Sequence, residues 1–111
     1  MYSASNLPQS IDIGYTGEKY FRELEVDLSD WLEEMPAGVA AVVYQKPGGT
    51  ATRPTVSAAD GILTWEISDT DLGTTEGVGS LQLEMSETAN GVTRIRKSHV
   101  IRVIVNLGLM R

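Results

Sequence analysis

The sequence predicts an all-β fold, an antiparallel sandwich of two sheets with about seven strands and one short helical turn. Residues 62–67 and 79–85 carry this prediction, because apolar and polar side chains alternate along both with the period of two that indicates a strand with one buried face. Pairs such as Gly48-Gly49 and Asn90-Gly91 separate such stretches and favour tight turns. The composition, 41% hydrophobic and 22% charged, is that of a domain that folds on its own.

The length and composition limit what the chain can be. Its 111 residues suffice for one hydrophobic core but leave no room for a second domain. It contains no cysteine, which excludes a disulfide framework, a thiolate metal site and a cysteine nucleophile. The net charge of -6 argues against nucleic acid as a partner, because binding phosphates needs clustered basic groups. No apolar run approaches the roughly 20 residues of a membrane span, so we expect no membrane partner and no secretion signal.

The chain divides into an N-terminal segment, a domain and a tail. Residues 1–9 lack periodicity and are expected to form an irregular N-terminal arm. Residues 10–105 hold the sandwich, and residues 106–111 form an apolar tail or linker end. The N-terminal arm and the tail carry apolar side chains outside any strand that the pattern predicts, so we expect them to contact a partner. The interface candidates are Tyr2, Leu7, Leu107, Leu109 and Met110.

The first part of the domain combines strands with one helical turn. Residues 10–14 alternate over too few positions for more than a short edge strand. Residues 19–28 alternate throughout, which predicts a long strand with one buried face. Residues 29–36 combine capping residues, early acidic groups and a proline stop, so a helical turn should place Trp31 and Leu32 over one end of the sandwich. The buried face of the long strand holds Tyr20, Leu24, Val26 and Leu28.

The second part supplies most of the core. Residues 38–46 are almost continuously apolar and predict a central strand. A short strand over residues 55–58 reverses at Gly61 into the strand that carries Trp65. The polar side chains of residues 68–71 favour capping of a helical turn at a corner, and the last strand ends near residue 105. The expected core residues are Val26, Leu28, Val43, Trp65, Leu81 and Leu83.

The hairpin around Asn90-Gly91 allows two registers. A two-residue loop places Met85 opposite Arg96, whereas a three-residue loop that includes Ala89 places Met85 opposite Ile95. We favour the three-residue loop, because it pairs an apolar side chain with Met85 and a charged one with Glu84. It requires a bulge near residue 98 to restore the alternation of the last strand.

No constellation of catalytic, cofactor-binding or metal-binding residues stands out. Glu23, Glu25 and Asp27 lie on one face at about 7 Å spacing, which a glycosidase pair could use, but strand carboxylates facing water are typical of a solvated surface. His99 is the sole histidine and lacks the partners of a triad or zinc site. Asp69 and Asp71 offer oxygen ligands for a cation, but capping is the simpler interpretation. We therefore expect no enzyme, no cofactor and no metal.

Several short motifs nevertheless follow one another in a specific order. They combine turn glycines, core tryptophans and an aspartate that follows a strand. They are Gly17-Glu18, the stretch from Val26 to Trp31, the stretch from Tyr44 to Gly48, Trp65 followed by Asp69-Thr70-Asp71, and Gly77-Val78-Gly79 leading into Gln82-Leu83.

This order resembles the small immunoglobulin-like domains of phage and prophage tail proteins, in particular the amino-terminal domain of baseplate upper proteins and related fibre proteins. The resemblance covers residues 10–105 and implies an immunoglobulin-like sandwich, here without the cysteine pair. It also implies a non-enzymatic adaptor that attaches or displays receptor-binding parts. Such a module is made in the bacterial host cytoplasm, resides in the virion tail, contacts other tail or baseplate proteins and forms a homo-oligomer.

A carbohydrate-binding module is the alternative function. Sugar recognition needs exposed aromatic rings on which a sugar can stack. With both tryptophans buried, the aromatics available for a host surface carbohydrate are Tyr2, Tyr15, Phe21 and Tyr44.

Overall fold

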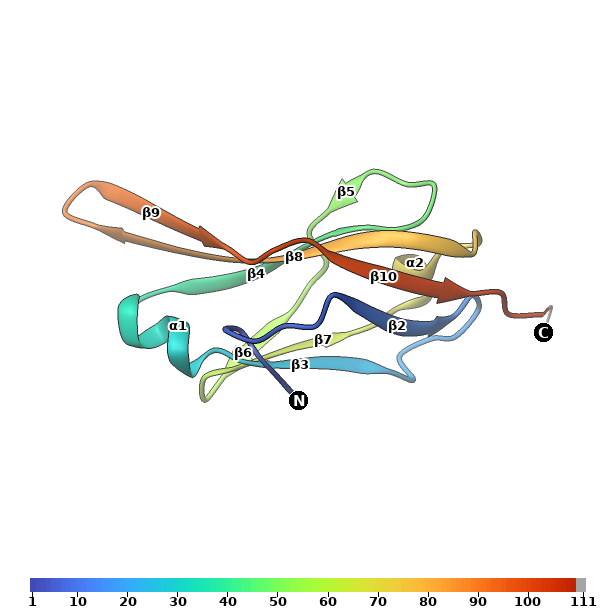
Figure 1. The fold of residues 1–111 in the computed structure, drawn as a ribbon, viewed down its shortest axis with the longest axis horizontal. Coiled ribbons are helices and arrows are strands. Elements are labelled where there is room, and N and C mark those ends of the chain that lie inside the picture. Colours follow the sequence, from blue (N-terminus) through green and yellow to red (C-terminus); the bar gives the residue numbers. More distant parts are fainter. Residues whose placement is uncertain (110–111) are drawn as a thin grey trace.

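The computed structural model describes residues 1–109 as two β-sheets packed face to face around one core (Figure 1). The first sheet contains, in spatial order, β1 (Tyr2–Ser3), β3 (Glu23–Asp27), β7 (Ile62–Glu66) and β6 (Ser57–Ala59). The second contains β2 (Ser10–Tyr15), β10 (Ile101–Asn106), β8 (Gly77–Ala89), β4 (Val39–Gln45) and β5 (Ala51–Thr52), and β9 (Val92–Lys97) also pairs with β8. The helices are α1 (Ser29–Glu34) and α2 (Asp69–Leu72). The predicted all-β, two-sheet sandwich is therefore confirmed.

The architecture differs from the expected one in strand direction and number. The described residues form ten strands and two short helices, and both sheets are mixed, because β1 runs parallel to β3 and β2 runs parallel to β10. Both parallel pairs involve the N-terminal segment, which supplies an edge strand to each sheet. The expected irregular N-terminal arm, residues 1–9, is therefore partly ordered into the sandwich. The amide of Ala4 donates to Asp27 O at 2.9 Å, and Leu7 is buried.

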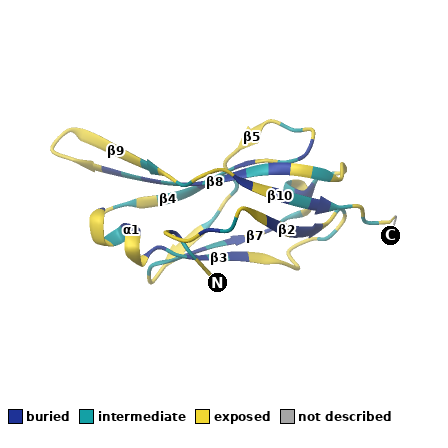
Figure 2. Ribbon diagram, viewed as in Figure 1, coloured by how far each residue is buried: buried dark blue, intermediate teal, exposed yellow. Residues whose placement is uncertain are grey.

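The core lies between the two sheets, where the buried segments of their strands face one another (Figure 2), and forms around Trp65, which is completely buried. Of the expected core residues only Val43 is not fully buried, because Val42 and Tyr44 are the residues of β4 that face inward. Trp31 of α1 is buried as expected, and Leu32 packs against the core. At 25 cal/mol per Å², each fully buried large apolar side chain contributes about 1.5–3 kcal/mol relative to exposure. The inward positions of β4 and β7 therefore stabilise the contact between the two sheets.

The expected long strand over residues 19–28 is shorter than its alternation predicts. Tyr20 has φ 53° and its side chain is exposed, so the regular strand β3 begins only at Glu23. A positive φ at a non-glycine residue takes the chain out of the extended conformation. The connection between β2 and β3 therefore leaves Tyr20 and Phe21 in solvent.

The β8–β9 hairpin projects beyond the sandwich as a two-stranded extension, here called the arm and defined as residues 84–97 (Figure 1). The register favoured above is wrong. Ala89 pairs with Val92 and Met85 with Arg96, as a two-residue loop requires. Asn90 and Gly91 have φ 54° and 76°, the paired left-handed geometry of a type I′ turn, which follows the right-handed twist of the strands.

A break between β9 and β10 lets both strands pair with β8. The amide of Ser98 donates to Leu83 O at 2.9 Å, and the amide of Leu83 donates to Ser98 Oγ at 3.0 Å. The interruption shifts the alternation by one residue, so Arg96 and Ile101 both point toward the inner face. The expected irregularity near residue 98 is thus present. With the arm projecting from one end, the molecule measures 52 × 25 × 22 Å.

Candidate functional site

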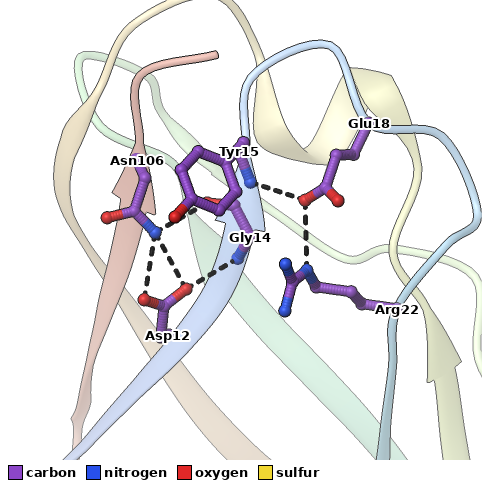
Figure 3. Close-up of polar contacts among 6 residues, drawn as sticks. All are labelled: Asp12, Gly14, Tyr15, Glu18, Arg22 and Asn106. Carbon is purple, nitrogen blue, oxygen red and sulfur yellow. Dashed lines mark hydrogen bonds and ion pairs between the residues drawn. The ribbon is translucent and has the colours of Figure 1, made fainter.

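At the C-terminal end of the sandwich, hydrogen bonds fasten the end of β2 to the end of β10 (Figure 3). Asn106 Nδ2 donates to both carboxylate oxygens of Asp12 at 3.0 Å and to Gly14 O at 3.1 Å. The amide of Gly14 donates to Asp12 Oδ1 at 2.9 Å. Gly14 has φ 116°, a conformation that glycine adopts without strain, and it lies at the register shift between β2 and β10. The end of β2 is therefore held in one position.

The loop after β2 carries a second cluster, shown in the same view (Figure 3). Glu18 Oε1 accepts from the amide of Tyr15 at 2.7 Å and from Arg22 Nε at 3.1 Å. The Arg22 guanidinium lies 5.8 Å from the ring centroids of both Tyr15 and Phe21. Stacking of this kind is worth about 0.5–1 kcal/mol at exposed sites. We call Tyr15, Glu18, Phe21 and Arg22 the Arg22 patch.

The aromatic side chains of the Arg22 patch, and that of Tyr20 next to Phe21 in the sequence, are exposed to solvent. Phe21 is 76% exposed, and Tyr15 and Tyr20 are also exposed. The amide of Gly108 donates to Thr16 Oγ1 at 2.9 Å, which holds the C-terminal segment against the turn after β2. The segment presents the exposed side chains of Leu107 and Leu109 there. Exposed apolar groups in one region are typical of an interaction surface.

The interface candidates predicted from the sequence differ in how far the structure exposes them. Leu107 and Leu109 are exposed at this end of the molecule, as a contact surface requires. Tyr2 is partly exposed in β1, but Leu7 is buried in the core and is not available to a partner. Met110 lies outside the described residues.

Of the aromatics considered for sugar stacking, Tyr44 is buried, whereas Tyr15 and Phe21 come together at Arg22. Sequence alternation missed this cluster because it treated Phe21 as part of a strand. The available signal was the Gly17-Glu18 turn with an arginine four residues after the glutamate.

The base of the arm holds a buried charge that the sequence did not reveal. Glu87 is buried, and it accepts from Arg94 and, at 2.8 Å, from the amide of Ala37. The Arg94 hydrogen bond, followed by that of Ala37, lowers the pKa of the Glu87 carboxyl from its ordinary value. Arg96 lies 4.8 Å from the Trp31 ring and donates to Glu34 at 2.9 Å. These contacts attach the inner face of the arm to α1.

Two further candidate groups, Asp71 and His99, have structural partners. Ser68 and Asp71 form a capping box on α2, and Asp71 Oδ2 also accepts from Trp65 Nε1 at 3.0 Å. His99 Nε2 lies 3.0 Å from Pro8 O. Within residues 1–109, no group of three or more histidine, aspartate or glutamate side chains is arranged to hold a metal ion. No helix in that range is long and apolar enough to cross a membrane.

Hollows border α2. One of about 420 Å³ is lined by Tyr20 and by polar side chains that include Glu66 and Asp71. A smaller one of about 190 Å³ is lined in part by Tyr44, whose buried hydroxyl has no hydrogen-bond partner in the described part of the chain.

Comparison with known proteins adds no relative: no family model, no curated protein and no solved structure matches this chain.

Proposed function

We propose that this chain is a non-enzymatic structural adaptor of a phage or prophage tail, a module that attaches or displays receptor-binding parts of the virion. The observation that carries the proposal is the exposed apolar surface at the C-terminal end, formed by the Arg22 patch with Leu107 and Leu109. Its backbone is fixed by the Asn106–Asp12 and Gly108–Thr16 hydrogen bonds. A prearranged apolar surface loses less conformational entropy when a partner binds than a flexible one does.

The strand order supports the immunoglobulin-like part of the proposal. The order β1-β3-β7-β6 corresponds to strands A-B-E-D of an immunoglobulin domain, and β10-β8-β4 corresponds to G-F-C. A fold alone does not define a function. The assignment to a tail therefore rests on the order of the sequence motifs together with the exposed surface.

The test is to induce prophages in cells that carry the gene, purify the particles and quantify this chain in the tail fraction by mass spectrometry. The proposal expects a stoichiometric amount relative to other tail proteins. It also expects that Phe21→Asp reduces incorporation while Glu33→Lys, a charge change at an exposed position of α1 at the opposite end of the sandwich (Figure 1), does not. A chain found only in the soluble extract, with particles complete without it, would contradict the proposal.

Carbohydrate binding is the second candidate, and one observation favours it. Tyr15 and Phe21 present exposed rings 5.8 Å from the Arg22 guanidinium, which is paired with Glu18, so the site combines stacking surfaces with hydrogen-bonding groups. Glycan-array binding that is lost in Phe21→Ala and Tyr15→Ala but kept in Tyr20→Ala would favour this function over the adaptor.

A further inference from the structure

The hydroxyl of Tyr44 is the one buried side-chain polar atom in residues 1–109 that lacks a hydrogen-bond partner. The side chain is 1% exposed, and its ring lies 5.0 Å from that of Trp65. A buried hydroxyl without a partner is destabilising, and most buried polar groups in native proteins are paired. The fold therefore holds a hydrogen-bonding group that its own side chains do not use.

Tyr44 forms part of the wall of a hollow of about 190 Å³ beside α2. It lies on β4 with its side chain directed inward, and the Trp65 indole next to it donates to Asp71 Oδ2 on α2 at 3.0 Å. Asp71 lines the same hollow. Burial raises the pKa of the Tyr44 hydroxyl, and the nearby Asp71 charge adds to this effect. The hydroxyl therefore points from the core toward α2 and the hollow.

The rim of this hollow is formed in part by a segment without regular structure. Arg53 and Pro54 line the hollow and belong to residues 53–56, which form no helix or strand. The Arg53 side chain is 59% exposed. A small shift of this segment gives a ligand access to the Tyr44 hydroxyl, because no strand pairing has to be broken.

A larger hollow of about 420 Å³ shares Pro54, Thr70 and Asp71 with the first one. Its wall also contains Glu66 and Tyr20, whose ring is exposed. We call the two hollows together the α2 cleft. Its volume is in the range of small-molecule sites, which is about 300–1,000 Å³.

The charges that line the α2 cleft are balanced. Two carboxylates, Glu66 and Asp71, are present together with two cations, Lys46 and Arg53. Opposite charges in equal number give no net preference for an anion or a cation. The cleft therefore suits a neutral polar ligand.

Several of these polar groups have unused hydrogen-bonding capacity. Within residues 1–109, both side-chain hydrogen bonds of Asp71 use Oδ2, so Oδ1 has no donor. In the same part of the chain, Lys46 Nζ donates once, to Thr70 O at 3.2 Å, although an ammonium group has three donors. Free donors and acceptors in one cleft match a ligand with several hydroxyl groups, because each hydroxyl both donates and accepts.

The α2 cleft also offers apolar ring surfaces. Tyr20 and Pro54 both line the larger hollow. The apolar face of a sugar ring stacks on such surfaces, while its hydroxyls bond to the polar groups around them.

We propose that the α2 cleft binds a neutral saccharide, with one sugar oxygen accepting from the Tyr44 hydroxyl, one sugar hydroxyl donating to Asp71 Oδ1, and the Tyr20 ring stacking on a sugar face. This site is separate from the Arg22 patch. It gives the domain a binding activity that goes beyond the adaptor function and does not depend on it.

The experiment titrates the isotope-labelled full chain with neutral disaccharides of glucose, galactose, mannose and N-acetylglucosamine, and follows binding by nuclear magnetic resonance. Wild type is expected to bind at least one of them, with the largest shifts at the backbone amides of Thr52, Thr70 and Asp71, which border the Tyr44 hollow. Thermal unfolding verifies the fold of each variant.

Two variants test the contacts. Tyr44→Phe keeps the ring and should weaken binding about tenfold, because the sugar oxygen loses its buried donor. Tyr20→Asn should weaken binding about fivefold through lost stacking, and asparagine tolerates the positive φ at this position. The matched control Tyr2→Phe, which removes a tyrosine hydroxyl on β1 outside the cleft, should bind like wild type.

A wild-type chain that binds none of these sugars at millimolar concentration would overturn the proposal. So would equal affinities of Tyr44→Phe and wild type. Binding that is lost in Phe21→Ala but kept in Tyr44→Phe would place the sugar at the Arg22 patch instead of the cleft. Incorporation into tail particles of a chain that binds no sugar would leave the adaptor function standing and remove only the saccharide site.

Discussion

Trp65 Nε1 donates to Asp71 Oδ2 at 3.0 Å, and the same oxygen accepts from the amide of Ser68 at 3.0 Å. The Asp71 carboxylate thus accepts hydrogen bonds both from the buried indole N–H of Trp65 and from the backbone amide of Ser68 at the start of α2. A buried N–H without an acceptor is destabilising. This arrangement connects the core of the sandwich to the corner between β7 and β8.

The first prediction is that Asp71→Ala lowers the free energy of unfolding by about 2–4 kcal/mol, because it removes an N-terminal capping partner and leaves a buried indole N–H unpaired. Urea unfolding followed by circular dichroism measures the change. Asp71→Asn, which retains a side-chain oxygen, should cost less. Equal stability of Asp71→Ala and wild type would show that the indole hydrogen bond contributes nothing.

The second prediction concerns Tyr44, whose ring lies 5.0 Å from that of Trp65 and whose buried hydroxyl lacks a partner among the described residues. Burial, with a smaller effect of the Asp71 charge, raises the pKa of Tyr44 from 10.0 to about 12. The unfolded chain therefore loses this proton first, so the free energy of unfolding should fall as the pH rises from about 10 to about 12.

Ultraviolet titration of the phenols should show one tyrosine that ionises later than the others, and Tyr44→Phe should remove that late phase. Tyr44→Phe should also unfold with equal or greater free energy than wild type, because it deletes an unsatisfied buried group. A loss of more than about 1 kcal/mol would instead indicate that the hydroxyl has a hydrogen-bond partner such as water.

The third prediction concerns the Glu87 carboxylate at the base of the arm. Its pKa is lowered in the folded state by Arg94 and by the amide of Ala37. The unfolded state therefore binds a proton more readily at acidic pH. The stabilisation is present above the ordinary glutamate pKa and is lost as the pH falls through the lowered value.

Glu87→Gln should reduce thermal stability at neutral pH, and the difference from wild type should shrink when the unfolding temperature is measured at successively more acidic pH. Glu76→Gln, at an exposed loop position, is the matched control and should show little difference at any pH. A gap between Glu87→Gln and wild type that is constant across the acidic range would argue against the charge of Glu87 as the cause.

The sequence predicted correctly those features that depend on residues close together along the chain. Trp65, Leu81 and Leu83 are buried as predicted, because alternation alone assigns their face. The predicted start of the strand at residue 19 was wrong, because φ 53° at Tyr20 depends on a turn that the alternation does not encode.

The contacts of the candidate site were harder to predict, since they join distant segments. Asp12 and Asn106 are 94 positions apart, and the parallel pairing of β2 with β10 that unites them leaves no periodic signal in either strand. The prediction placed Leu107 and Leu109 correctly on the exterior but not Leu7, because an unpatterned segment can still be packed by tertiary contacts.

The hairpin register illustrates a failure of side-chain reasoning. Pairing Met85 with Ile95 looked favourable because both are apolar, but Arg96 satisfies the same position by stacking on Trp31 and bonding to Glu34. The Asn90-Gly91 turn, whose two residues both adopt positive φ, was the stronger signal.

The fourth prediction tests this register by disulfide formation. Thr88 lies opposite Thr93, and their hydroxyl oxygens are 2.9 Å apart. Because Ala89 and Val92 form the hydrogen-bonded pair that closes the turn, Thr88 and Thr93 form a non-hydrogen-bonded pair, whose Cα separation of about 4.5 Å suits a disulfide. Thr88→Cys combined with Thr93→Cys should therefore oxidise readily, and the absence of native cysteine makes the assay unambiguous.

The comparison variant combines Thr88→Cys with Val92→Cys, which would be opposite each other if the loop had three residues. In the two-residue register Val92 faces the other side of the arm, so this pair should oxidise more slowly. Free-thiol titration after mild oxidation measures both variants, and proteolysis followed by mass spectrometry separates intramolecular from intermolecular bonds. Faster oxidation of the Thr88→Cys/Val92→Cys variant would establish the three-residue register and shift Ile95 to the inner face of the arm.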